Sequence, residues 1–274
     1  MKRILFLITL IFSFVCLTGC STAKWNEEKG VLRVGLECAY APFNWTETEK
    51  TDDNVPIKGT NMYANGYDIQ MAKLIAEDMD CELEIHMIEW DGLVVALKSG
   101  KIDLIIAGMS PTEERKKSIS FTDAYYTSKH VLVMQANSEY VNAKTFADLD
   151  DAKIMGQAST VYDKLADQIC DKNENAKYQN PLDNVPAIVY AIESGIVDIT
   201  VLEEPVAKGV VASNPEFTYI TLEEEFELEE ADKVVSIGVR KNDTRLLELV
   251  NASLAKINTE TREQLMEAAV NQGE

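Results

Sequence analysis

Positive charge is scarce in this sequence. Its 274 residues include 26 Lys and Arg against 46 Asp and Glu, which gives a formal net charge of −20 at neutral pH. Proteins that bind nucleic acid neutralise phosphates with clustered Lys and Arg. The composition therefore argues against a nucleic-acid partner, and it is compatible with a soluble exported protein.

Cysteine spacing and catalytic motifs are lacking as well. Cys38, Cys81 and Cys170 lie far apart, and no CxxC or other metal-ligand spacing is present. We therefore expect no metal site and buried free thiols, with a Cys38–Cys81 disulfide as the alternative. There is no GxGxxG, P-loop or HExxH motif. Neither His86 nor His130 has a Ser or Cys partner in a recognisable pattern, so we expect no cofactor and no enzymatic activity.

Only one stretch is long and strongly apolar, and it lies within the first 20 residues, MKRILFLITLIFSFVCLTGC. Two basic residues precede an apolar run of about 14 residues, shorter than the roughly 20 that span a bilayer. This layout is typical of a secretory signal peptide, and LTGC resembles the bacterial lipobox, in which the chain is cut before Cys and that Cys carries lipid. We predict a signal peptide over 1–19, a lipid on Cys20 and a tether over 20–30. An ordinary signal peptide or a membrane anchor is the alternative.

The remaining chain alternates strand and helix patterns. Apolar residues recur at helical spacing over 66–79 and alternate with polar residues over 81–88. Strand, helix, strand, helix, strand indicates an α/β unit with a parallel sheet wrapped by helices, and the pattern restarts near Lys153. The expected elements are strands over 32–37, 81–88, 102–108, 152–156 and 196–202, helices over 66–79, 91–97, 160–170 and 184–194, and a helical tail after Lys241. We expect a surface loop over 46–64 and a solvated charge run over 223–230.

Two stretches that are 95 residues apart nearly repeat each other. VALKSGKIDLIIAG covers 95–108 and YAIESGIVDITVLE covers 190–203. Each predicts a helix, a Gly stop and a buried strand. The first copy ends in Gly108 and the second in Glu203. The same helix–turn–strand unit therefore ends in a residue without a side chain in one copy and in a carboxylate in the other.

Ligands of open α/β sheets bind beyond the carboxyl ends of strands. After Gly108, Ser110 is a candidate helix N-cap, Pro111 suits the first helical position and Glu113 completes a capping box. Such a helix start favours an anion, and Arg115 follows with a planar fork that matches a carboxylate. The alternatives are a surface charge for Arg115 and a simple cap for Ser110.

The second unit offers an anion instead. Glu203 ends its repeated strand, and Gln157 and Thr160 follow another strand, where Thr160 and Asp163 are spaced as a capping box. A guanidinium, carboxylates and helix starts in one cleft suit a zwitterion such as a free amino acid. The alternative for Glu203 is a solvated acid.

Aromatic residues also follow strands of the first unit. Tyr40, Phe43 and Trp45 come after the first strand and Trp90 after the next. They are candidates to sandwich a ligand side chain, with the hydrophobic core as the alternative.

The sequence resembles the solute-binding proteins of polar amino-acid ABC importers. The resemblance covers nearly the whole chain after Cys20 and is carried by LRVGLECAYAPFNW, ANGYDIQMAKLIAEDM, EWDGLVVALKSGKIDLIIAGMSPTEERKKSISFTDAYYTS and DITVLEEPVAKG. It implies an α/β, two-lobed clamshell of the periplasmic-binding-protein type 2, each lobe a mostly parallel sheet wrapped by helices. The implied crossovers lie near 128–133 and 232–236. They give a first lobe of 31–131 plus 236–274 and a second of 132–235, in a monomer.

The resemblance also implies roles for individual residues. The α-carboxylate of an amino acid would meet Arg115 of the TEER stretch, groups at Gly108 and Ser110, and the backbone N–H groups of Thr160 and Val161. Glu203 would bind the α-ammonium, and Tyr40 and Trp90 would enclose the ligand side chain. Glu37 would bind a cationic or amide tip of that side chain, and Gln157 stands at a variable position that helps to set selectivity. The family usually has Asp where this chain has Glu203.

The implied function is the extracytoplasmic binding component of an ABC importer, whose permease and ATPase are separate chains. Lipid on Cys20 would hold it at the outer face of the cytoplasmic membrane, extracellular in a Gram-positive bacterium and periplasmic otherwise. Arginine or lysine is the expected ligand because a cation can stack between rings and reach Glu37. Glutamine follows, then histidine or another polar amino acid. A cyclohexadienyl or arogenate dehydratase on the same fold and the extracellular half of a receptor are the alternatives.

Overall fold

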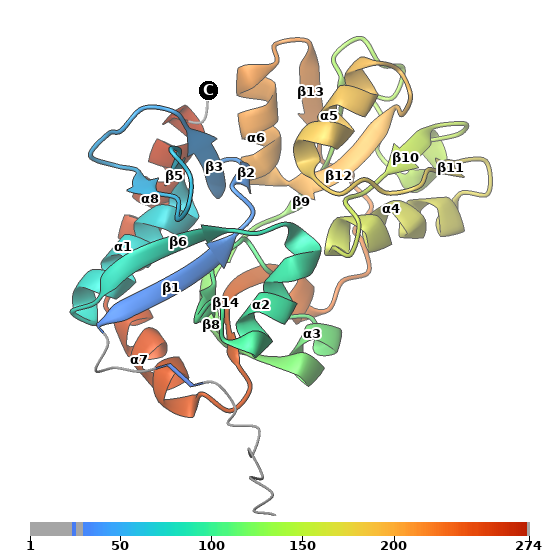
Figure 1. Ribbon diagram of the computed structural model, residues 1–274. Coiled ribbons are helices and arrows are strands. Elements are labelled where there is room, and N and C mark those ends of the chain that lie inside the picture. The colour runs from blue at the N-terminus through green and yellow to red at the C-terminus, as the bar shows by residue number, and fades with distance from the viewer. Residues whose placement is uncertain (1–23, 26–29, 273–274) are drawn as a thin grey trace, which may run out of the picture.

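The computed structural model describes residues 24–25 and 30–272 and shows an α/β protein of two lobes, each built on a five-stranded sheet (Figure 1). The predicted signal peptide and the predicted lipid site at Cys20 lie outside these residues. Among the described helices, none combines the length and the apolar character that a bilayer crossing requires.

The first lobe contains the sheet in the order β6-β1-β7-β14-β8. Its strands are β1 (Val31–Leu36), β6 (Glu82–Met87), β7 (Leu104–Ile105), β8 (Ile119–Thr127) and β14 (Val234–Arg240). The helices packed around it are α1 (Tyr67–Asp78), α2 (Leu93–Ser99), α3 (Glu113–Ser118), α7 (Thr244–Leu254) and α8 (Thr259–Gln272). Helix α1 forms where predicted, because Ile69, Ala72, Ile75 and Ala76 give it one continuous buried face.

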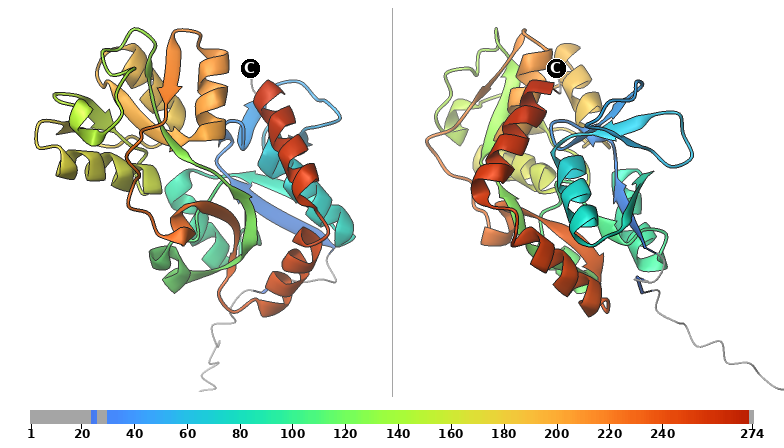
Figure 2. Two further views of the ribbon diagram at one scale, coloured as in Figure 1. Left: turned by 180° about the vertical axis from the view of Figure 1, so that it is seen from behind. Right: turned by 90° about the vertical axis from the view of Figure 1, so that its left-hand side faces the viewer.

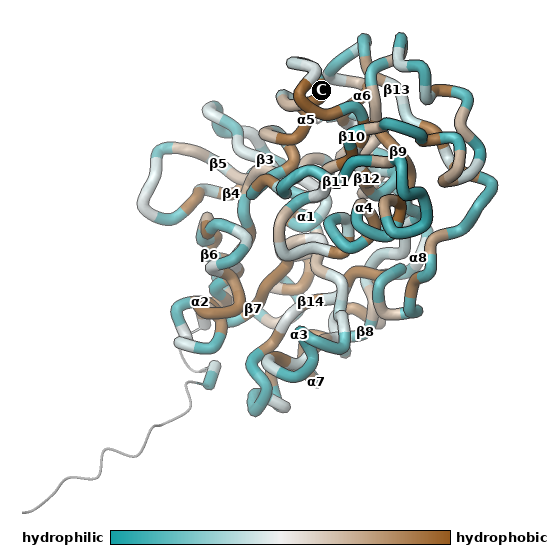
Figure 3. Tube along the Cα trace, turned by 90° about the vertical axis from the view of Figure 1, so that its right-hand side faces the viewer, coloured by the Kyte–Doolittle hydropathy of each residue, from teal (hydrophilic) through white to brown (hydrophobic). Residues whose placement is uncertain are grey.

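The second lobe repeats this plan in the order β11-β10-β12-β9-β13. Its strands are β9 (His130–Gln135), β10 (Lys153–Met155), β11 (Lys177–Tyr178), β12 (Ile199–Glu203) and β13 (Phe217–Ile220), and its helices are α4 (Val161–Lys172), α5 (Val185–Glu193) and α6 (Glu204–Ser213). The two near-repeated stretches therefore supply the central strands, β7 and β12, of their sheets. The chain around β7 is strongly hydrophobic (Figure 3), as a central strand requires.

The predicted fold class is confirmed, with sheets that are mixed. In each sheet two parallel strand pairs are followed by two antiparallel pairs: β7 meets β14 and β12 meets β9 in antiparallel register. The antiparallel strands flank the points where the chain passes between lobes. Strand β9 enters the second sheet directly after β8 leaves the first, and β14 returns after β13. Thr127 pairs with Val234, and the Ser128 amide donates to the Lys233 carbonyl at 3.3 Å, so the two crossing segments lie side by side.

Two local expectations were wrong. The expected surface loop over 46–64 contributes to a small antiparallel sheet of β2 (Ala39–Tyr40), β3 (Asn44–Glu47), β5 (Tyr63–Asn65) and β4 (Val55–Pro56). Its polar residues bond to one another, since Glu47 accepts from Trp45, Asn54 and Asn65. Met87 ends β6 with 43% of its surface exposed, although the alternation placed it on the buried face.

The charge run follows the expectation and the cysteines follow it in part, since Cys38 is buried whereas Cys81 and Cys170 are half-buried. Cys38, Cys81 and Cys170 form no disulfide. Residues 223–230 are mostly exposed, while Phe226 and Leu228 pack on the core of the second lobe. Helix α8 packs against α1 of the first lobe and α6 of the second, and Figure 2 shows it running along the junction.

A buried ionic cluster at the base of the first lobe gives a test of the fold. Asp103 is fully buried and accepts from Arg33 at 2.8 Å and from Arg240 at 2.9 Å. We expect Asp103→Asn to lower the free energy of unfolding by about 3 kcal/mol, because it removes the buried carboxylate that Arg33 and Arg240 share and leaves the buried Arg240 with Asp243 alone. Urea denaturation measures this change. Asp151→Asn is the control, since its pair with Lys177 is exposed and should contribute little. Equal effects of the two substitutions would contradict the prediction.

Candidate functional site

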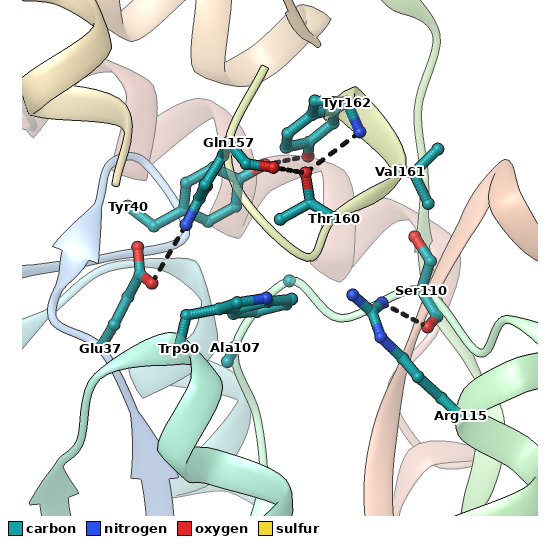
Figure 4. A pocket seen from close by; sticks show the side chains of 11 residues that line it. Glu37, Tyr40, Trp90, Ala107, Ser110, Arg115, Gln157, Thr160, Val161 and Tyr162 are labelled. Carbon is teal, nitrogen blue, oxygen red and sulfur yellow. Dashed lines mark hydrogen bonds between the residues drawn. The ribbon is translucent and has the colours of Figure 1, made fainter. Parts of the chain in front are cut away.

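The predicted site residues come together where the lobes face each other. Nine of the ten line one inter-lobe pocket, whose free space, including the part open to solvent, is about 320 Å³. The pocket is lined by Glu37, Tyr40, Trp90, Ala107, Gly108, Ser110, Arg115, Gln157, Thr160, Val161 and Tyr162 (Figure 4). Glu203 is the predicted residue that is not in the lining.

One end of the pocket is built from the segment after β7. The predicted cap at Ser110 is wrong: helix α3 begins at Glu113, and Thr112 caps it by accepting from the Arg115 amide. The chain therefore forms no helix over 106–112, and the helix begins later than the Ser-Pro pair suggests. Gly108 has φ 59°, and a Cβ there would lie 2.7 Å from the Tyr40 ring, so a side chain at this position would be strained and crowded.

Arg115 spans the mouth of the pocket. Its guanidinium donates to the Ser110 carbonyl at 2.9 Å and to the Ser159 carbonyl of the other lobe at 3.0 Å. It also lies over the Trp90 ring at 5.0 Å from the centroid. Both donated bonds go to carbonyl oxygens, and burial lowers the pKa of Arg115 to about 10. A guanidinium has five N–H donors, so further donors are left for an anion.

The start of α4 forms the facing wall. Thr160 caps the helix as predicted: it accepts from the Tyr162 amide at 3.1 Å and donates to the Gln157 carbonyl at 2.7 Å. The other half of the predicted capping box is wrong, because Asp163 accepts instead from Tyr178 at 2.6 Å. The first backbone N–H groups of a helix have no partner within the helix, so this wall presents donors to the cleft.

The far end of the pocket holds Glu37, of which 9% is exposed. One carboxylate oxygen accepts from Gln157 of the other lobe at 3.4 Å. The second oxygen, Oε1, is buried and has no hydrogen-bond partner among the described residues. Burial raises the pKa of Glu37 to about 7, and Glu89 adds to the effect. A buried carboxylate oxygen without a partner is costly, so this oxygen is a place where a ligand cation or hydrogen-bond donor would be stabilised.

Glu203 lies behind the pocket lining and is 3% exposed. Its carboxylate accepts from the Tyr40 hydroxyl at 3.2 Å and hydrogen-bonds to the Tyr162 hydroxyl, and the two hydroxyls contact each other. Burial raises the pKa of Glu203 to about 8. The sequence reasoning did not single out Tyr162, although its place in the first turn of α4, two residues after the predicted cap, was a signal that it faces the cleft.

These contacts connect the two lobes. Glu37, Tyr40, Trp90 and Arg115 of the first lobe each hydrogen-bond to the second, and the partner of both Trp90 and Arg115 is the Ser159 carbonyl. The pocket is therefore a space that exists only where the lobes are together.

Comparison with known proteins gives a consistent result. The family model of bacterial extracellular solute-binding proteins, family 3, matches residues 32–271. The arginine-binding extracellular protein ArtP of Bacillus subtilis is 27% identical over 259 residues, covering 94% of this chain and 93% of ArtP. A probable histidine-binding protein of Campylobacter jejuni is 31% identical over 79% of each chain.

A solved structure is similar over most of its length. The amino acid ABC transporter substrate-binding protein AbpA from Streptococcus pneumoniae, bound to L-arginine, aligns with a TM-score of 0.75 and 28% identity, covering 90% of this chain and 97% of AbpA.

The raised pKa of Glu203 predicts how stability depends on pH. Between about pH 4.5 and 8 the folded protein holds this proton more tightly than the unfolded chain, so the contribution of Glu203 to stability is full below pH 4.5 and is lost as pH rises through 8. We expect the free energy of unfolding of the ligand-free protein, relative to that of Glu203→Gln, to fall over this range. Urea denaturation from pH 5 to 8.5 measures it, with exposed Glu216→Gln as the control. A difference that stays constant with pH would refute the assignment.

Proposed function

This chain belongs to family 3 of the bacterial extracellular solute-binding proteins, and we propose that its pocket binds a cationic amino acid, arginine before lysine, for delivery to an ABC permease. The permease and its ATPase are separate chains. Lipid on Cys20 would hold the protein at the outer face of the cytoplasmic membrane, and the binding component itself would be a monomer.

The observation that carries the proposal is the buried, unpartnered oxygen of Glu37. A guanidinium presents parallel N–H donors that match a carboxylate, and such charge-assisted bonds are about twice as strong as neutral ones. The aromatic ring of Trp90 lies in the same wall and offers a face to the flat cation. ArtP, an arginine-binding protein, and AbpA, which binds L-arginine, support this choice.

The α-groups of the ligand would be held at the other end. The α-carboxylate would accept from the remaining donors of Arg115, from the region of Gly108 and Ser110, and from the backbone N–H groups of Thr160 and Val161. The α-ammonium would be received by Glu203 together with the hydroxyls of Tyr40 and Tyr162, which cover it. The extra methylene of Glu, relative to Asp, sets the carboxylate behind these hydroxyls.

Binding would close the lobes by a hinge motion. We propose a first lobe of 31–131 plus 236–274 and a second of 132–235, with the paired crossing segments at Thr127 and Val234 as the hinge. Ligand would replace the direct inter-lobe hydrogen bonds with bonds through itself. Its differential affinity for the closed form would then shift the population of lobes towards closure.

We propose a binding role rather than an enzymatic one. A dehydratase needs a general acid beside its substrate, and the two carboxyls near the pocket, Glu37 and Glu203, are both placed to pair with charged ends of an amino acid. Glutamine is the next candidate ligand, because its amide can donate to Glu37 without the assistance of charge.

A comparison of L-arginine with L-citrulline tests the proposal. The two share α-groups and differ in whether the side-chain tip is charged. We expect arginine to bind more tightly by calorimetry, and Glu37→Gln to weaken arginine binding at least about 30-fold while changing citrulline binding little. Glu82→Gln is the matched control, since Glu82 is exposed and outside the pocket. Tighter binding of citrulline, glutamine or glutamate than of arginine would reject a cationic ligand.

A further inference from the structure

Asp68 is fully buried in the first lobe and is absent from the pocket lining, yet hydrogen bonds through Asn44 and Tyr125 link it to the backbone at both ends of the pocket. We propose that Asp68 is a positioning residue, which fixes the side-chain end and the carboxylate end of the bound amino acid through two separate arms. This inference rests on the proposed function and adds residues that do not contact the ligand. We call Asn44, Asp68 and Tyr125 the Asp68 network.

The first arm leads to Glu37. One oxygen of Asp68 accepts from the Asn44 side-chain amide at 2.8 Å, and the Asn44 oxygen accepts from the Cys38 backbone amide at 2.8 Å. Cys38 has φ 57°, a left-handed conformation that residues other than Gly rarely adopt and that persists where the surroundings enforce it. Because Cys38 directly follows Glu37, this turn sets the direction in which the Glu37 carboxylate leaves β1.

The second arm leads to Gly108. The other oxygen of Asp68 accepts from the Tyr125 hydroxyl at 2.6 Å, and that hydroxyl accepts from the Gly108 backbone amide at 3.1 Å. Gly108 also has a left-handed φ, and the Tyr40 ring lies against it. The Tyr125 hydroxyl therefore holds the strand end at which the ligand carboxylate is expected. Tyr125 itself lies on β8, two residues before the end of that strand and the crossing to the second lobe.

The composition of the network favours positioning over stability. Asn44, Asp68 and Tyr125 are each no more than 1% exposed. Asp68 receives these bonds from neutral donors, and a buried carboxylate without a cation is costly to keep compared with apolar packing. Its place in the first turn of α1 gives the charge partial support from the helix dipole. The cost of burying Asp68 is explained if its carboxylate holds the turn at Cys38 and the turn at Gly108 in a fixed relation to each other.

Three probes separate the two arms. L-arginine and L-citrulline differ at the side-chain tip, whereas L-arginine and agmatine differ by the α-carboxylate. We expect Asn44→Ala to lower the arginine-to-citrulline affinity ratio about tenfold, as loss of one hydrogen bond predicts, and to leave the arginine-to-agmatine ratio unchanged. We expect Tyr125→Phe to lower the arginine-to-agmatine ratio about tenfold and to leave the arginine-to-citrulline ratio unchanged. Competition calorimetry measures both ratios.

The control is Ser253→Ala, which removes a partly buried hydrogen bond of 2.7 Å to Asp78 at the other end of α1. It should lower stability and change neither ratio. If Asn44→Ala and Tyr125→Phe behave like this control, the network is structural only and the proposal is overturned. If the unaltered protein binds none of the probes, the proposed function fails instead. Hydrogen exchange of the ligand-free protein then decides: faster exchange at Cys38 in Asn44→Ala and at Gly108 in Tyr125→Phe supports the network, and unchanged exchange overturns it.

Discussion

Charged groups withdrawn from water at the junction of two lobes are the constraint on which this structure depends. Glu37, Glu203 and Arg115 each lose solvent without gaining an ion pair within the described residues. Burial accordingly raises the pKa of both carboxyls and lowers that of the guanidinium. A zwitterion with a cationic side chain, the ligand that we propose, would supply an opposite charge to each of the three groups.

The fold delivers these groups by using one architectural device twice. The near-repeated stretches form a helix, a Gly turn and a central strand in each lobe, and the ends of β7 and β12 point to the same cleft. Gly108 leaves room at the first strand end, and Glu203 places a carboxylate at the second. The two crossing segments pair with each other at Thr127 and Val234, between the two sheets whose strand ends face each other.

Much of this could be read from the sequence because it depends on periodicity and on strand ends. Buried faces at regular spacing predicted α1, α4, α5 and the strands around them, and the rule that ligands meet the carboxyl ends of strands selected the region of Gly108 and Glu203. Resemblance to a family then connected positions far apart in the chain. Local polarity was a weaker guide: Glu47 and its partners form a small sheet where a loop was expected, and the helix after Gly108 begins at Glu113 rather than beside Ser110.

What sequence reasoning missed depends on tertiary contact. The contact of Tyr162 with Tyr40 joins residues 122 positions apart. The hydrogen bonds that link Asp68 through Asn44 to Cys38 and through Tyr125 to Gly108 also join separate segments of the chain. Neither periodicity nor capping rules refer to such distances. The unpartnered oxygen of Glu37 belongs to the same class, since only the packed structure shows which donors fail to reach it.

The most direct test of the account is the number of protons released when L-arginine binds at pH 7. With pKa values raised to about 7 and about 8, Glu37 and Glu203 hold protons in the ligand-free protein, and cationic partners favour their ionised forms. Calorimetry in buffers of different ionisation enthalpy should therefore give a binding enthalpy that varies linearly with the buffer, with a slope of about one proton released. A slope of zero, or net proton uptake, would contradict the claim that desolvated carboxyls await the cationic groups of the ligand.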